Sequence, residues 1–288
     1  MRASLAVNGR SLTLYDQVYA LQDYNKKRVH KLFLLQLQKL LPANCKPIVI
    51  TDAGFRNSWF QTVRKMGWDF IGRVRNNTQY CMENESIWMP IKSLYTKATL
   101  KPQYVGSVRL ARYNPTACYF HLIKQKKKYR VKRNLIGKRV QCSSSIKHET
   151  REREPWLIAT SLSRNEFASS SVITLYKKRM QIEEAFRDLK NTRNGLGLRH
   201  CRSFKIERLN VALLIASLAM LALWIFGNAA MQKKLHYSYQ ANTEKKSHVL
   251  SVILIGWQVL IRKEVQFKRN ELMAALSKNI GVTKRAVS

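Results

Sequence analysis

Residues 176–190 read YKKRMQIEEAFRDLK, and this stretch constrains the fold most because it holds neither glycine nor proline. Nearly every residue favours a helix, so we expect one continuous helix that begins near Ser169. At about 100° per residue, one stripe is polar and holds Tyr176, Arg179, Glu183 and Lys190. The neighbouring stripe is apolar and holds Leu175, Ile182, Phe186 and Leu189. We expect the apolar stripe to face a core and the polar one to line a cleft for a phosphate-bearing ligand. The simpler alternative is an i,i+4 ion pair of Arg179 with Glu183 on the surface.

The chain is strongly basic, because 52 lysines and arginines oppose 17 aspartates and glutamates and give a formal net charge of +35. So large an excess of one sign repels itself unless a polyanion offsets it. Nucleic acid is therefore the expected partner, and an anionic membrane surface is the second choice. The five cysteines lie far apart with no C-x2-C pair, which argues against a zinc finger and a disulfide scaffold and favours a reducing cytoplasm.

One apolar segment, residues 211–226, could be mistaken for a membrane span. It is 16 residues long, whereas a bilayer core needs about 20. We expect a buried core helix here, with a membrane anchor as the alternative. Residues 1–16 alternate instead of forming an apolar block, so no signal peptide is expected.

The first 75 residues predict helices and strands in alternation. Residues 1–18 predict a β-hairpin that turns at Asn8-Gly9, and residues 25–41 predict a helix that Pro42 ends. The apolar run 47–51 predicts a buried strand with Asp52 at its carboxyl end. A helix is expected next over residues 55–66, and then a strand over residues 68–74.

The remaining chain predicts three further regions. Residues 75–153 predict short strands, at 79–82, 104–111 and 118–123. Residues 155–161 predict a strand that returns to the core. The helices expected beyond residue 200 cover 210–226, 249–262 and 267–276.

Asp52 is the first residue that we expect to bind a metal ion. Carboxylates are scarce in this chain, which has only five aspartates, and Asp52 follows a strand with no basic residue in the three positions before it. Hard oxygen ligands of this kind suit Mg²⁺. The alternative is that Asp52 caps the following helix.

The spacing Y-x2-R-x3-E-x6-K of Tyr176, Arg179, Glu183 and Lys190 resembles the signature of the DDE transposases that move bacterial insertion sequences by cut-and-paste, the family of the tetracycline-resistance transposon's enzyme. Residues 49–56 (VITDAGFR) and 195–203 (GLGLRHCRS) resemble the same family. The resemblance extends from near residue 1 to about residue 265.

The resemblance implies an α/β fold with a ribonuclease H-like core. Its first part would be residues 1–75, a β-rich insertion would occupy residues 76–153, the rest of the core would follow in residues 154–200, and residues 201–288 would form a C-terminal helical region. The family's first catalytic Asp lies on the central strand, which precedes the hairpin. We therefore expect an N-terminally truncated transposase that is inactive alone, because Asp16 and Asp23 are not in the expected place.

The resemblance also implies the roles of individual residues. Asp52 and Glu183 would be catalytic and would bind Mg²⁺ or Mn²⁺, with Glu184 as a rival that only the spacing excludes. The residues expected to hold DNA near the transposon end are Tyr176, Arg179 and Lys190. Trp156 would receive a flipped base, although a core tryptophan is nearly as good a reading. A basic ribbon along the phosphates would consist of Lys126, Lys127, Lys128, Arg130, Lys132 and Arg133, unless this run is only a solvated hairpin tip.

The function expected is transposition of double-stranded DNA by two-metal phosphodiester cleavage and strand transfer, in a bacterial cytoplasm and at the nucleoid. A homodimer in a complex with both transposon ends is expected. One alternative is a catalytically inactive DNA-binding or dimerising fragment that interferes with the full-length enzyme. Another is a nuclease with the same core.

Overall fold

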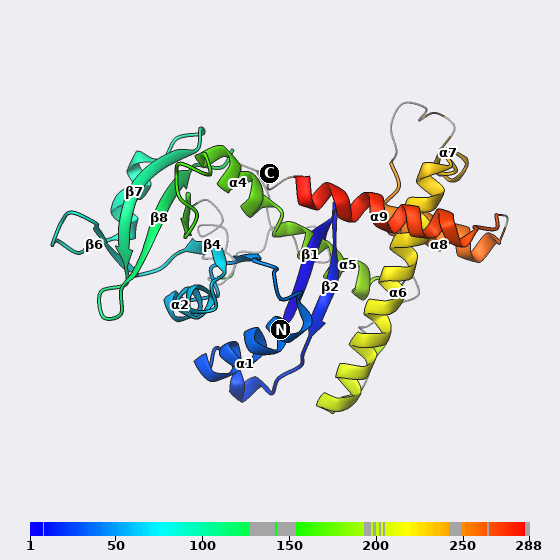
Figure 1. Cartoon of the computed structure of the whole chain (residues 1–288), viewed down its shortest axis with the longest axis horizontal. Coiled ribbons are helices and arrows are strands. Elements are labelled where there is room, and N and C mark those ends of the chain that lie inside the picture. The colour runs from blue at the N-terminus through cyan, green and yellow to red at the C-terminus, as the bar shows by residue number, and fades with distance from the viewer. Residues whose placement is uncertain are drawn as a thin grey trace. The chain divides into compact units, whose positions relative to one another are not determined.

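The computed structural model describes residues 1–7, 9–126, 142, 154–192, 197, 200, 201, 203, 205–241, 243, 249–263 and 265–285. The chain divides into two compact units (Figure 1). Unit 1 comprises Met1–Tyr24, Leu35–Leu40 and Met180–Ser288, and unit 2 comprises Asn25–Leu34 and Leu41–Arg179. Helix α1 (Lys27–Leu40) contributes to both units.

Unit 2 contains a seven-stranded sheet with the order β3-β4-β9-β8-β7-β5-β6. Its strands are β3 (Ile48–Thr51), β4 (Asp69–Val74), β5 (Gln79–Met82), β6 (Met89–Pro90), β7 (Gln103–Leu110), β8 (Thr116–Ile123) and β9 (Trp156–Thr160). Strands β3 and β4 are parallel, and all other pairs are antiparallel. This mixed sheet with helices confirms the expected α/β class. The strands of the expected insertion, β5 to β8, belong to the same sheet, because β8 pairs with β9. Strand β3 lies at one edge of this sheet.

Two helices cover opposite faces of this sheet. Successive residues of a strand point to opposite sides, so the neighbours Phe70 and Ile71 of β4 contact different helices. Helix α2 (Asn57–Lys65) packs the ring of Phe60 on Phe70, with centroids 4.5 Å apart. The same ring lies over Gly72, where a Cβ atom would stand 2.4 Å from it. Helix α4 (Ser169–Lys177) packs on the other face of β4, where Ile71 joins the buried cluster that holds Val172, Ile173, Leu175 and Tyr176.

His121 fixes the start of α4 to the sheet. Its side chain on β8 is fully buried, and Nδ1 lies 3.0 Å from the hydroxyl of Ser169. Burial, together with the charge of Arg164, lowers the pKa of His121 to about 4 from 6.5. The folded chain therefore keeps His121 neutral where an unfolded chain would protonate it.

We expect acid to destabilise the protein through His121. The contribution of neutral His121 to the free energy of unfolding is complete above pH 6.5. It is lost as the pH falls toward 4, and by linkage the total loss is about 3 kcal/mol. Urea unfolding between pH 7 and pH 4.5 should show this loss in the wild type. His121→Phe should be less stable at pH 7 but should vary less with pH. Parallel pH curves for the two proteins would contradict the assignment.

Unit 1 contains the predicted hairpin, which is confirmed as the antiparallel pair β1 (Arg2–Val7) and β2 (Arg10–Asp16). Gly9 in its turn has φ +76°, a conformation that favours glycine. The helices are α5 (Met180–Lys190), α6 (Ile206–Gln232), α7 (His236–Tyr239), α8 (Val252–Arg262) and α9 (Arg269–Arg285). The core between the hairpin and these helices includes Val7, Leu189, Met220, Trp224 and Ile253.

Helix α6 is 27 residues long, and only part of it is a core helix. Its second half is buried, but Val211, Leu214, Ile215 and Leu218 are 56–62% exposed. The expected buried helix over residues 211–226 is thus correct for one half and wrong for the other, because unit 1 offers the first half too few partners. Among the described residues, α6 is the one helix that is long and apolar enough to cross a membrane, and 22% of its most apolar window is buried.

Candidate DNA-processing site

The continuous helix predicted over residues 176–190 is interrupted. Helix α4 ends at Lys177 and α5 begins at Met180, and the N–H groups of Lys178 and Arg179 donate to carbonyls three residues back. The interruption coincides with the boundary between the two units. The reason lies in the apolar stripe, since Leu175 is buried in the core of unit 2 and Leu189 in that of unit 1. A local pattern could not reveal that its two halves serve different cores.

The polar stripe is divided in the same way. Tyr176 and Arg179 belong to unit 2, together with Asp52 and Trp156, whereas Glu183 and Lys190 belong to unit 1. Within unit 2, three of the predicted residues are in contact, namely Trp156, Tyr176 and Arg179.

One group of contacting side chains in unit 2 combines aromatic rings with arginines. We call it the aromatic–arginine cluster, and it consists of Arg73, Trp156, Tyr176 and Arg179. The ring of Trp156 on β9 meets the ring of Tyr176 on α4 edge to face, with centroids 5.1 Å apart. The guanidinium of Arg179 lies 5.9 Å from the centre of the Tyr176 ring, and that of Arg73 lies 5.8 Å from the Trp156 ring. Tyr176 is buried, whereas Trp156 is only partly buried. The cluster thus combines aromatic rings with two guanidinium groups, the groups that stack on bases and bind phosphates.

Arg73 is the member that the sequence did not predict. It lies on β4 and donates from one terminal nitrogen to the carbonyls of Glu154 and Pro155, at 3.1 and 3.4 Å. Burial, followed by the charge of Arg75, lowers the pKa of Arg73 to about 10. Arg75 lies 3.6 Å from the Glu154 carboxylate. The signal that could have found them is two arginines at i,i+2, one near the end of the mostly apolar strand β4 and one just after it.

Asp52 lies at the carboxyl end of β3, as predicted, and its side chain is exposed. One carboxylate oxygen accepts the N–H of Gly54 at 2.8 Å. The N-cap of α2 is Arg56, so the alternative that Asp52 caps this helix is wrong. Burial raises the pKa of the Tyr176 hydroxyl, and the negative charge of Asp52 adds to that rise. Asp52 is therefore within electrostatic reach of the aromatic–arginine cluster.

Glu183 lies in the first turn of α5 and is exposed, as is Lys190 at the end of that helix. The Lys190 ammonium is 6.0 Å from the centre of the Phe186 ring. The rival Glu184 forms an ion pair with Arg187. Among the residues that the structure describes, no group of three or more His, Cys, Asp or Glu side chains could hold a metal ion. The third ligand of the expected three-carboxylate site is therefore not identified among the described residues.

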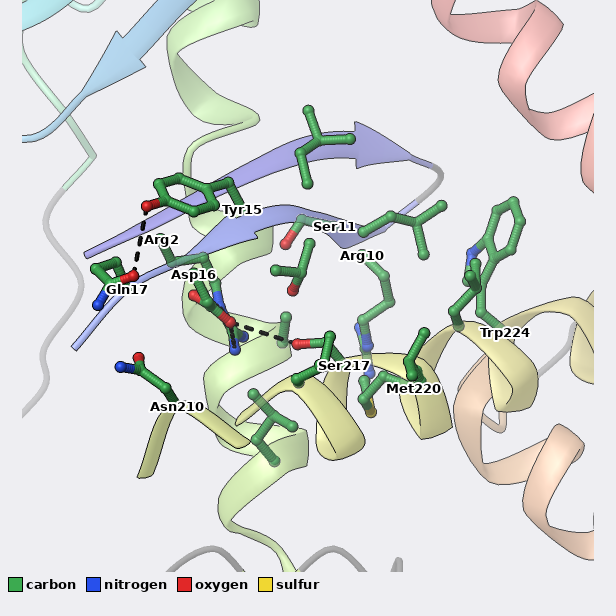
Figure 2. A pocket seen from close by; sticks show the side chains of 18 of the residues that line it. Arg2, Arg10, Ser11, Tyr15, Asp16, Gln17, Asn210, Ser217, Met220 and Trp224 are labelled. Carbon is green, nitrogen blue, oxygen red and sulfur yellow. Dashed lines mark hydrogen bonds and ion pairs between the residues drawn. The ribbon is translucent and has the colours of Figure 1, made fainter. Parts of the chain in front are cut away.

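Asp16 is not a free substitute for that third ligand (Figure 2). Its carboxylate accepts from Nε of Arg2 at 2.8 and 3.0 Å and from the hydroxyl of Ser217 at 3.4 Å. The Arg2 and Asp16 side chains are only 2% and 12% exposed. They lie at the wall of a cavity of about 530 Å³ between β2, α5 and α6. Both oxygens of Asp16 are committed to holding the hairpin.

The basic ribbon falls mostly outside the described residues. Lys126 is exposed just after β8. The other predicted members, Lys127, Lys128, Arg130, Lys132 and Arg133, lie beyond the described part of the chain, and their role stays a prediction.

Comparison with known protein families finds a match over residues 1–221 to the family described as the transposase DDE domain. No curated protein matches the chain.

Proposed function

The chain belongs to the transposase DDE domain family, and from this premise we propose that it serves cut-and-paste transposition of a bacterial insertion sequence by DNA cleavage and strand transfer. The observation that carries the proposal is the aromatic–arginine cluster of unit 2, which lies within electrostatic reach of Asp52 at the end of β3. A carboxylate for metal binding, guanidinium groups for phosphates and a partly exposed indole for a base are the parts that this reaction needs.

The proposed core is ribonuclease H-like and needs one more strand. The order of hairpin, helix, strand with Asp52, helix and strand supports this fold. Strand β3 is paired on one side only among the described residues, and β1 pairs with β2 alone. We propose that in the active enzyme a further strand pairs with the free edge of β3 and carries the third carboxylate.

Asp52 and Glu183 are proposed to hold Mg²⁺ or Mn²⁺. Both residues are exposed, and Asp52 uses one carboxylate oxygen for the N–H of Gly54, so its second oxygen can serve as a donor to a hard cation. When bound, such ions activate the attacking oxygen and stabilise the leaving one. Arg179 then holds the phosphate group, with its guanidinium over the buried ring of Tyr176, and Trp156 stacks on an unpaired base of the DNA end.

A second function is supported by the same missing ligand. A form of the protein that assembles only two of the three carboxylates would bind DNA without cutting it. Such a protein would interfere with a full-length transposase, through a homodimer or by occupying the transposon ends. We place either form in the bacterial cytoplasm at the nucleoid.

The test of DNA binding uses Arg179. Arg179→Ala should weaken binding to DNA of any sequence and lower the slope of log K against log salt by about 1, because one phosphate contact is lost. Arg112→Ala, which removes an exposed arginine between β7 and β8, is the matched control and should leave the slope unchanged. Fluorescence anisotropy over a salt series measures both. Equal effects of the two substitutions would refute the role of Arg179.

A further inference from the structure

A second basic surface of unit 2 lies on α1 and the loop before α2. We call it the basic patch, and it consists of Lys27, Arg28, Lys31 and Arg56. Between residues 26 and 65 the sequence has nine lysines and arginines and a single acidic residue, Asp52. All four side chains of the patch belong to exposed residues.

The patch lies next to Asp52 because aromatic contacts fix it there. The ring of His30 lies 5.5 Å from the ring of Phe55 and 5.4 Å from that of Trp59. The N–H of Phe55 in turn donates to the carbonyl of Asp52 at 3.4 Å. Burial lowers the pKa of His30, so this ring acts as a neutral aromatic anchor. The first turns of α1 are thereby docked on the turn that presents Asp52.

The charges of the basic patch do not stabilise the fold through ion pairs with described residues. None of its four side chains forms an ion pair with a described residue, whereas the nearby Lys46 and Arg64 both pair with Asp69, at 3.1 and 2.9 Å. On α1, Lys27, Arg28 and Lys31 fall on one face within about 100°. Like charges held together in this way repel each other unless an anion offsets them.

The patch and the aromatic–arginine cluster approach Asp52 from opposite sides of the sheet. Trp59 and the patch belong to the layer of α2, which packs on the face of Phe70. Tyr176 belongs to α4, which packs on the face of Ile71. One phosphate group cannot contact both surfaces, so DNA that uses both contacts them with different stretches of backbone.

We propose that the basic patch binds the backbone of a second DNA duplex, the target into which the cut end is joined, so that Asp52 lies between the two DNA segments. This inference rests on the proposed transposase function. Lysines and arginines on a helix surface bind phosphates without reading bases. That property suits a target that is accepted at many sequences.

The test compares two triple variants of the full chain on a 30-base-pair duplex of arbitrary sequence. Lys27→Gln, Arg28→Gln and Lys31→Gln together should lower the slope of log K against log salt by about 2–3 and weaken binding at least about tenfold. The matched control, Lys92→Gln, Lys97→Gln and Lys101→Gln, removes the same charge from exposed positions of the insertion and should change the slope by less than about 1. Circular dichroism melts confirm that both variants fold.

A hairpin-ended DNA with unpaired bases separates the two surfaces. Trp156→Ala should lose the preference for this DNA and keep duplex binding, and the patch variant should do the reverse. Equal losses for the patch variant and its control overturn the inference, as does a patch variant that keeps duplex binding and loses the preference for the hairpin-ended DNA. Absence of any DNA binding by the wild type would instead overturn the proposed function.

Discussion

Asp52→Asn is expected to lower DNA cleavage about a thousandfold or more while DNA binding and thermal stability stay unchanged. Its carboxylate lies exposed at the end of β3, where its hydrogen bond to the N–H of Gly54 can also be made by an amide oxygen. The substitution therefore removes charge without removing structure. Losing one group that stabilises charge in a transition state costs about 100- to 1,000-fold, and a lost metal ligand should cost at least as much.

Glu183→Gln is expected to have the same effect, and Glu184→Gln is the matched control on the next residue. Glu184 is paired with Arg187, so its loss should reduce cleavage only slightly. The assay is single-turnover release of a labelled strand from transposon-end DNA, with the enzyme extended by the proposed additional strand. A Glu183→Gln enzyme that still cuts, beside a Glu184→Gln enzyme that does not, would reverse the assignment.

Gly256→Ala should destabilise unit 1 by at least about 2 kcal/mol, although alanine favours a helix by about 1 kcal/mol over glycine. Helices α6 and α8 cross with backbone against backbone. A Cβ on Gly256 would lie 2.0 Å from the carbonyl oxygen of Leu223, and one on Gly227 would lie 2.0 Å from that of Val252. Even a methyl group therefore forces the helices apart.

Urea unfolding followed by circular dichroism measures this effect. Ile261→Ala is the control, because it shortens a side chain that is 56% exposed on the same helix. It should cost less than about 1 kcal/mol. A Gly256→Ala protein as stable as the wild type would show that α6 and α8 do not cross at these glycines.

The elements that the sequence predicted correctly are those with a strong local pattern. The alternation around Gly9 gave the hairpin, and the apolar run before Asp52 gave β3. The break at Lys178 and Arg179 was missed because a helix pattern does not show which core each half joins. The exposure of Val211 was missed for a similar reason, since apolar composition indicates burial only where a partner is present.

The candidate site was predictable from the sequence only in part. Asp52 could be placed at a strand end from local pattern, and the structure brings Trp156, Tyr176 and Arg179 together from β9 and α4. Arg73 was not predictable as their neighbour, because its position depends on how β4 pairs with β9. The functions of these residues stay predictions.

The central proposal is that Asp52 and Glu183 are ligands of divalent metal ions. Protein cleavage by hydroxyl radicals from bound Fe²⁺, generated with ascorbate and peroxide and mapped by mass spectrometry, tests it most directly. The account predicts backbone cuts near residue 52 that Asp52→Asn removes and cuts near residue 183 that Glu183→Gln removes, with both sets suppressed by excess Mg²⁺. Absence of cuts near either residue, or cuts that persist when that residue is substituted, would contradict it.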